Sequence, residues 1–285
     1  MRVVARHSVD SNFAKEQVAG LGESIEKALG RLERFPQRLS SLLDTILMET
    51  GYRCALDAKA QYLETWESVV STMQVGSAIF ETGSRSEGVV ECRIAHKIWQ
   101  VPATGPQYWT NVHNWLTALW LAMICRERGR ARRLAEMPLE LLRASSEQFD
   151  DFEFPWVESL QMFWRNEQGL FDKLMPAMKA TAPEQIRVTT TEYALLQVWP
   201  TMRTFYHLVQ GENEQFNDVL AEAVQLHKDY WTADEERAKD PDGFIALGPL
   251  AMACLARDWD VAVEVESEYL PEHLINGAWV GEFRT

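Results

Sequence analysis

The sequence predicts a mainly α-helical protein, either an irregular helical bundle or a solenoid-like array, with one small β-hairpin. Apolar residues recur with helical spacing along most of the 285 residues, and the segments between them are short. Only one segment, near residues 89–101, alternates as a strand pair does. No repeat of about 34 residues is present, so a regular tetratricopeptide array is not expected.

Three helices are expected before the hairpin, over residues 11–35, from residue 40 or 41 to beyond 48, and over 59–79. Pro36 ends the first of them, because the residue before a proline avoids the helical conformation. Residues 90–94 then alternate apolar and charged side chains, and residues 98–101 follow after a tight turn. This pattern predicts the hairpin.

The central element is a helix over residues 115–125, in which only Thr117 is polar. A helix that is apolar on every face is buried on every face. It is too short to span a membrane, which takes about 20 apolar residues. Gly129 is expected as the residue just beyond its C-terminus. We expect its large apolar side chains to lie in the core: Trp115, Leu116, Leu119, Trp120, Met123 and Ile124.

Shorter helices are expected in the rest of the chain, over residues 130–136, 139–144, 156–164, 170–178, 190–208, 214–231 and 244–256. Pro176 and Pro200 are expected to kink or break the helices that contain them. Residues 261–266 read as a short strand and residues 271–275 as a last helical turn. We expect the N-terminal helices, residues 1–88, to form one continuous domain with residues 89–285.

The cysteines and the N-terminus indicate a cytoplasmic protein. Cys54, Cys92, Cys125 and Cys254 have neither disulfide-framework nor metal-ligand spacing, so we expect reduced thiols. The first residues lack the apolar segment of a secretory signal, and no apolar run is long enough to cross a membrane. No membrane association is expected.

The net charge of −14 is distributed unevenly along the chain. Residues 1–143 carry 16 acidic and 18 basic side chains, whereas residues 144–285 carry 26 acidic and 10 basic, for net charges of +2 and −16. Such a field repels nucleic acid and anionic lipid and attracts basic partners, although a merely solubilising surface is the alternative. The arginines at 126, 128, 130, 132 and 133 are expected at a solvated helix end or paired with the acidic half.

Three kinds of motif in the sequence could indicate a catalytic or metal site. Asp150-Asp151, with Asn217-Asp218, is similar to the magnesium-binding motifs of all-α terpenoid synthases, but Pro155 breaks the helix that those carboxylates would need. Asp240-Pro-Asp-Gly243 lacks the further ligands of a calcium loop and reads as a turn. No metalloprotease, nucleophile-elbow or P-loop motif is present. We therefore expect no catalysis, metal or cofactor; a metal-dependent enzyme, a small-molecule binder and a helical adaptor remain the alternatives.

Residues 89–285 resemble the immunity protein 49 family of bacterial polymorphic toxin systems. The resemblance rests on the segments at 89–94, 101–106 and 115–126, and on Gly248-Pro-Leu-Ala-Met-Ala-Cys-Leu255 and Val265-Glu-Ser-Glu-Tyr-Leu-Pro271. It implies an all-α cytoplasmic antidote that binds one cognate toxin and blocks it without catalysis.

Three acidic clusters are the candidate partner-binding residues, because each has an aromatic neighbour able to anchor an interface. The first acidic cluster is Asp150, Asp151 and Glu153, beside Phe152 and Phe154, and is expected to be an exposed turn. The second acidic cluster is Asp234, Glu235 and Glu236, after Trp231. The third acidic cluster is Glu264, Glu266 and Glu268, before Tyr269. The first and third are favoured, and a basic toxin is the expected partner.

Overall fold

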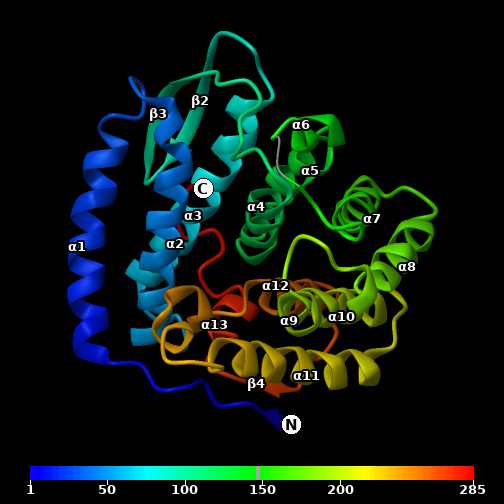
Figure 1. Ribbon diagram of the computed structural model, residues 1–285. Coiled ribbons are helices and arrows are strands. Elements are labelled where there is room, and N and C mark those ends of the chain that lie inside the picture. Colours follow the sequence, from blue (N-terminus) through cyan, green and yellow to red (C-terminus); the bar gives the residue numbers. More distant parts are fainter. Residues whose placement is uncertain (146–147) are drawn as a thin grey trace.

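The computed structural model describes residues 1–145 and 148–285, and it confirms the predicted fold class: mainly helical, with two small strand pairs. Figure 1 shows the first three helices side by side, α4 in the middle of the molecule, and α9 to α12 below it. Within the described residues, no helix combines the length and the apolar character that crossing a membrane requires.

The three N-terminal helices are α1 (Ser11–Leu29), α2 (Leu39–Leu56) and α3 (Leu63–Gly83). Asp10 caps α1, because its carboxylate accepts the backbone N–H groups of Asn12 and Phe13. The helix ends at Leu29, six residues earlier than the sequence predicts, and turns lead from it into the short 3-10 helix η1 (Pro36–Arg38). Proline is well placed there, at the start of a helix.

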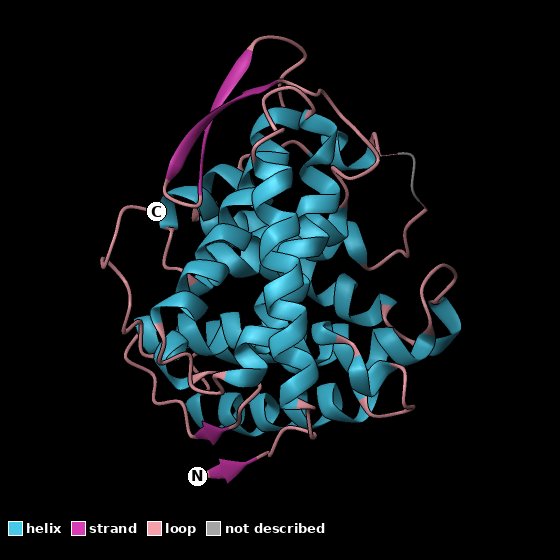
Figure 2. Ribbon diagram, turned by 90° about the vertical axis from the view of Figure 1, so that its left-hand side faces the viewer, coloured by secondary structure: helices cyan, strands magenta, loops and turns pink. Residues whose placement is uncertain are grey.

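The predicted hairpin is confirmed by β2 (Val89–Ile94) and β3 (Lys97–Pro102), which pair in antiparallel register. Ala95 and His96 form its two-residue turn with φ angles of 49° and 65°. Positive φ at both central residues is the geometry that matches the twist of paired strands. Figure 2 shows the hairpin at the end of the molecule opposite the N-terminus.

The central helix is confirmed as α4 (Val112–Ile124). Leu116 is half-buried, unlike the other five predicted core residues, which are buried. The indole N–H of Trp115 donates to the carbonyl of Leu134 at 2.9 Å, so the one polar atom of this buried ring is satisfied. A Cβ added to Gly76 of α3 would lie 3.2 Å from the Cβ of Ala118, which shows how closely α3 approaches α4.

The prediction that Gly129 follows the central helix is wrong. Arg126 takes the left-handed conformation after α4, with φ 58°, and Gly129 lies inside α5 (Arg128–Ala135). The reason is tertiary, since the guanidinium of Arg126 donates to the carbonyls of Ile124, Leu274 and Ile275 and pairs with Asp258 at 3.1 Å. These bonds offset the steric cost of that conformation in a residue with a Cβ.

Further helices, most of them shorter than the first three, make up the remainder of the chain, as predicted. They are α6 (Leu139–Arg143), α7 (Glu153–Arg165), α8 (Leu170–Ala180), α9 (Thr191–Tyr193), α10 (Trp199–Val209), α11 (Asn213–Trp231), α12 (Leu247–Asp258) and α13 (Glu272–Ile275). The 3-10 helices η2 (Pro183–Gln185), η4 (Arg237–Lys239) and η5 (Pro241–Phe244) connect some of them.

The predicted disturbance at Pro200 takes the form of a π-helix, η3 (Ala194–Val198), between α9 and α10. Proline has no N–H to donate to the carbonyl one turn back, so the helix before it widens instead of continuing regularly. Pro176, by contrast, lies inside α8.

A second strand pair joins the two ends of the chain. β1 (Arg2–Val3) runs parallel to β4 (Val265–Glu266), which is shorter than the strand predicted over 261–266. One hydrophobic cluster extends from Val4 to Ile275. All four cysteines are buried in the fold as free thiols.

Candidate functional site

The prediction that the first acidic cluster is an exposed turn is wrong for two of its three carboxylates, Asp150 and Glu153. Asp150 is only 3% exposed, and its carboxylate accepts the backbone N–H groups of Arg187, Val188 and Thr189 at 2.5, 2.9 and 2.8 Å. Burial alone would raise the pKa of Asp150, but these three donors outweigh it and lower the pKa. Asp150 therefore holds the segment before α9 in place.

Glu153 also points inward. It is 3% exposed, one carboxylate oxygen accepts the backbone N–H of Asp150 at 3.1 Å, and the other lies 3.7 Å from Nε2 of His113. Of the three carboxylates in the cluster, only Asp151 is exposed.

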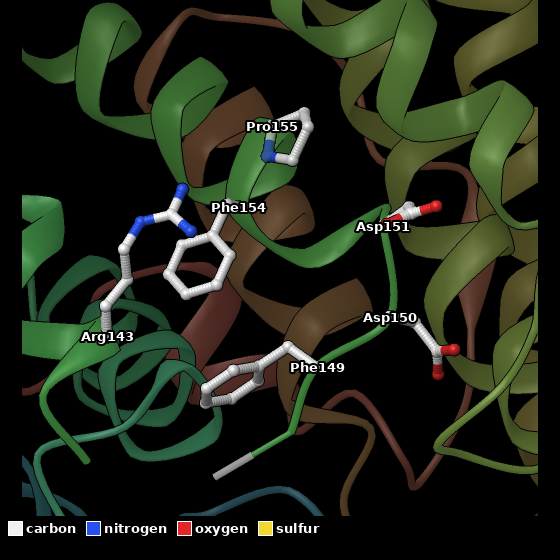
Figure 3. Close-up of a pocket in the computed structure, with 6 residues that line it drawn as sticks. All are labelled: Arg143, Phe149, Asp150, Asp151, Phe154 and Pro155. Carbon is white, nitrogen blue, oxygen red and sulfur yellow. The ribbon is translucent and has the colours of Figure 1, made fainter. Parts of the chain in front are cut away.

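The aromatic neighbours of this cluster face a different way from its carboxylates. Figure 3 shows Asp150 and Asp151 pointing away from Arg143, Phe149 and Phe154. The guanidinium carbon of Arg143 lies 3.8 Å from the centre of the half-buried Phe154 ring, a cation–π contact within the chain. Phe154 is therefore engaged by a cation of the protein itself, on the side away from the carboxylates.

Asn217 and Asp218, the second segment similar to a terpenoid-synthase metal motif, hold parts of the fold together. Asn217 donates to the carbonyl of Ala262 and accepts the N–H of Glu264, and Asp218 pairs with Arg2 at 2.5 Å. These bonds fix β4 and β1 to α11. In the described part of the chain, no three His, Cys, Asp or Glu side chains form a group that could hold a metal ion.

The second acidic cluster is exposed just after α11. Asp234 accepts the N–H groups of Glu236 and Arg237 and pairs with the Arg237 side chain at 3.4 Å, and Glu235 lies 3.7 Å from Lys239. The carboxylates therefore face solvent, although cations stand beside two of them.

In the third acidic cluster all three glutamates are exposed, and they alternate with inward residues such as the buried Val265. Tyr269 is not a surface anchor, since it is fully buried and its hydroxyl lies 2.6 Å from Nδ1 of His7. The prediction that Tyr269 anchors an interface beside these glutamates is therefore wrong, because its ring packs into the core.

The N-terminal segment lies between the second and third acidic clusters. Arg2 pairs with Glu264 at 3.2 Å, the N–H of Arg6 donates to Glu268 at 2.9 Å, and Nε2 of His7 lies 3.2 Å from the carbonyl of Ala238. These contacts relieve part of the repulsion expected among the glutamates. The six exposed carboxylates of the second and third clusters are together called the acidic face here: Asp234, Glu235, Glu236, Glu264, Glu266 and Glu268.

The sequence did not predict a cleft of about 230 Å³ in the middle of the molecule, here called the central cleft. Its lining residues come from α2, α4, α7, α9, the π-helix η3, α10, α11, η5 and α12. Three tryptophans, Trp120, Trp156 and Trp231, contribute to its walls. Its polar lining residues are Thr50, His113, Thr117, Tyr193, Gln197, Thr201, His227 and Asp242.

His227 fixes the hydrogen bonding at the base of this cleft. Burial lowers the pKa of His227 to about 4, so the ring is neutral at pH 7 and carries one N–H. Nε2 lies 3.1 Å from the carbonyl of Gly243, which can only accept, and Nδ1 lies 3.0 Å from Oε1 of Gln197. A neutral ring with its proton on Nε2 has only a lone pair at Nδ1, so the Gln197 amide must be turned by 180° to present its N–H there. The amide oxygen then takes the place of Nε2, which has no hydrogen-bond partner among the described residues.

Asp242 stands at the mouth of the central cleft with an exposed carboxylate. Among the described residues, none donates a hydrogen bond to this carboxylate or pairs with it. Partial removal of this carboxylate from water, together with the negative charges of Asp240 and Asp44, raises the pKa of Asp242 to about 6. Gly51 allows this arrangement, because a Cβ there would overlap the carbonyl of Pro241 as η5 crosses α2.

The sequence contains one signal for this cleft, the spacing of four residues that places His227 and Trp231 on one face of α11. Pro241 and Asp242 belong to the segment Asp240-Pro-Asp-Gly243, which the sequence indicates only as a turn, and the other lining residues come from distant segments.

A comparison with known protein families matches the part of the chain that contains most of these helices. The sequence model of the family Immunity protein 49 matches residues 57–274, so the match begins before α3, earlier than the resemblance from residue 89 suggested. No curated protein matches significantly, and neither does any solved structure. Immunity proteins act by binding a toxin and are generally not enzymes. Because the match covers more than half of the chain, the chain belongs to the immunity protein 49 family.

Proposed function

We propose that this chain is an immunity protein of a bacterial polymorphic toxin system, which binds one toxin in the cytoplasm and neutralises it without catalysis. The family match over residues 57–274 carries this proposal. The structure is consistent with a binding role, since Asp150, Asn217 and Asp218 are engaged in bonds that hold the fold together.

We further propose that the acidic face attracts a basic surface of the toxin, such as a cleft that binds nucleic acid. The −16 charge of residues 144–285 supports this, because such a field raises association rates with basic partners. Glu235, Glu236 and Glu266 are the candidates that we favour within the acidic face. All three are exposed, and among the described residues their one ion pair is that between Glu235 and Lys239.

The function is tested by growth protection. We expect a gene for the cognate toxin to lie beside this one. Bacteria that express that toxin should die, and co-expression of this chain should restore growth. A chain that is folded and abundant yet gives no protection against that toxin would contradict the proposal.

The role of the acidic face is tested by charge reversal. The triple variant E235K/E236K/E266K should bind the toxin at least about tenfold more weakly in low salt, mainly through slower association. The matched control is E16K/E23K/E26K, which changes the net charge equally at exposed positions on α1. If the two variants lose the same affinity, total charge matters and the acidic face is not the docking surface.

A further inference from the structure

The central cleft combines aromatic walls with a negative charge. Trp120, Trp156 and Trp231 line it, and ring faces attract cations. Asp242 is its only charged lining residue other than the histidines, and none of the described lining residues is Lys or Arg. Asp242 also lines a surface pocket with Asp44, Asp240 and Lys239. The two aspartates contribute to raising its pKa, so a cation bound on the cleft side would relieve repulsion among them.

Two acceptors of the cleft are available to a donor. The Gln197 amide, once turned to donate to His227, leaves its oxygen where Nε2 has no partner, and the carboxylate of Asp242 has no donor among the described residues. The indole N–H of Trp231, in contrast, is a donor that has no acceptor among the described residues. Burial raises the pKa of Tyr193 to about 12, and Tyr230, Glu153 and Asp242 contribute smaller increases. The contributions of Glu153 and Asp242 show that both carboxylates lie near the Tyr193 hydroxyl. The Tyr193 hydroxyl therefore stays neutral at pH 7, and its oxygen can accept.

A planar cation with several N–H donors fits this combination. A guanidinium has five N–H donors in one plane and stacks on aromatic rings, whereas an ammonium is a compact, strongly hydrated charge. We propose that the central cleft receives an arginine side chain of the toxin, which stacks among the tryptophans and donates to Asp242 and Gln197. This inference rests on the proposed function, because it assigns the toxin residue that the immunity protein would recognise.

The first test uses N-acetyl-L-arginine amide as the probe, titrated into the ¹⁵N-labelled full chain. The indole N–H signals of Trp120, Trp156 and Trp231 should shift and saturate together. N-acetyl-L-citrulline amide has nearly the same shape without the charge, and it should bind at least about tenfold more weakly. Equal binding of the two probes, equally tight binding of N-acetyl-L-lysine amide, or no saturable shift would each overturn the proposal.

Variants then assign the site. D242N should abolish saturable arginine binding. It should fold, because no residue that the structure describes forms a hydrogen bond with this carboxylate that the substitution would remove. D260N is the matched control, an exposed aspartate outside the cleft, and should bind the probe as the parent does. Y193F keeps the ring and removes one acceptor, so it should bind several-fold more weakly. Unchanged probe binding by D242N would contradict the assignment.

The toxin itself separates this inference from the proposed function. If the toxin does not bind the parent chain, the proposed function fails. If it binds the parent and D242N with equal affinity, only the arginine site fails. The expected result is binding by the parent and by D260N, with at least about a tenfold loss in D242N.

Discussion

Asp150 and Asp151 are neighbouring carboxylates with different surroundings. Asp150 accepts three backbone N–H groups from the segment before α9, whereas Asp151 faces solvent. Hydrogen bonds to an ionised acceptor are stronger than neutral ones, so the two residues should contribute very differently to stability.

We expect D150N to lower the free energy of unfolding by about 1.5–3 kcal/mol, since an amide cannot accept all three bonds as a carboxylate does. D151N is the control and should change it by less than about 0.5 kcal/mol. Urea denaturation of both variants at pH 7 measures this. Equal stabilities would show that the bonds to residues 187–189 contribute nothing.

His227 should make the stability depend on pH. Its pKa falls from 6.5 to about 4 on folding, so the unfolded chain binds more protons between these values. The stability from burying the neutral ring is therefore present above pH 6.5 and is lost as pH falls toward 4, by up to about 3 kcal/mol. Asp242, whose pKa is raised, acts in the opposite sense.

The comparison with H227Q isolates the histidine. Denaturation at intervals from pH 4 to 7 should show a steeper rise in stability for the parent than for this variant. Parallel curves would mean that the ring is not buried in its neutral form.

At the scale of elements, α4 connects the N-terminal helices to the C-terminal ones, because it packs against both α3 and α12. Leu119 is fully buried on this helix, and L119A should cost about 2–5 kcal/mol of unfolding free energy. L116A is the control, because Leu116 is half-buried and lines the central cleft. A loss below about 0.5 kcal/mol in L119A, or an equal loss in both variants, would contradict the central position of α4.

The helices were predictable because their signals are local. Apolar spacing and proline positions predicted α2, α3, α4 and α11 to within a few residues at most ends, and alternation predicted the hairpin. Arg126 shows what local signals miss: its left-handed conformation depends on the carbonyls of Leu274 and Ile275, about half the chain away. Sequence reasoning assigned that position to Gly129 because glycine is the usual local solution.

The same limit applies to the candidate sites. The acidic clusters were visible as runs of charge, but whether Asp150 points outward depends on residues 187–189, which no spacing connects to it. The central cleft exists only where helices from distant parts of the chain meet. The segment Asp240-Pro-Asp-Gly243 was visible in the sequence as a turn, but its place beside α4 and α11 was not.

At the scale of the whole molecule, the uneven charge and the family match support one mechanism, in which the chain captures a toxin and holds it. An antidote that acts by binding is consumed in proportion to its target, whereas a catalytic one is not. Stoichiometry therefore distinguishes the two mechanisms for this protein.

The most direct measurement is a titration of the toxin encoded beside this gene with the purified chain, reading the residual toxin activity. We expect activity to fall linearly and to reach zero near a fixed whole-number ratio, independent of incubation time once binding is complete. Loss of activity at a small fraction of that ratio, growing with time, would show catalytic inactivation. Full activity in excess chain would show that this toxin is not its target.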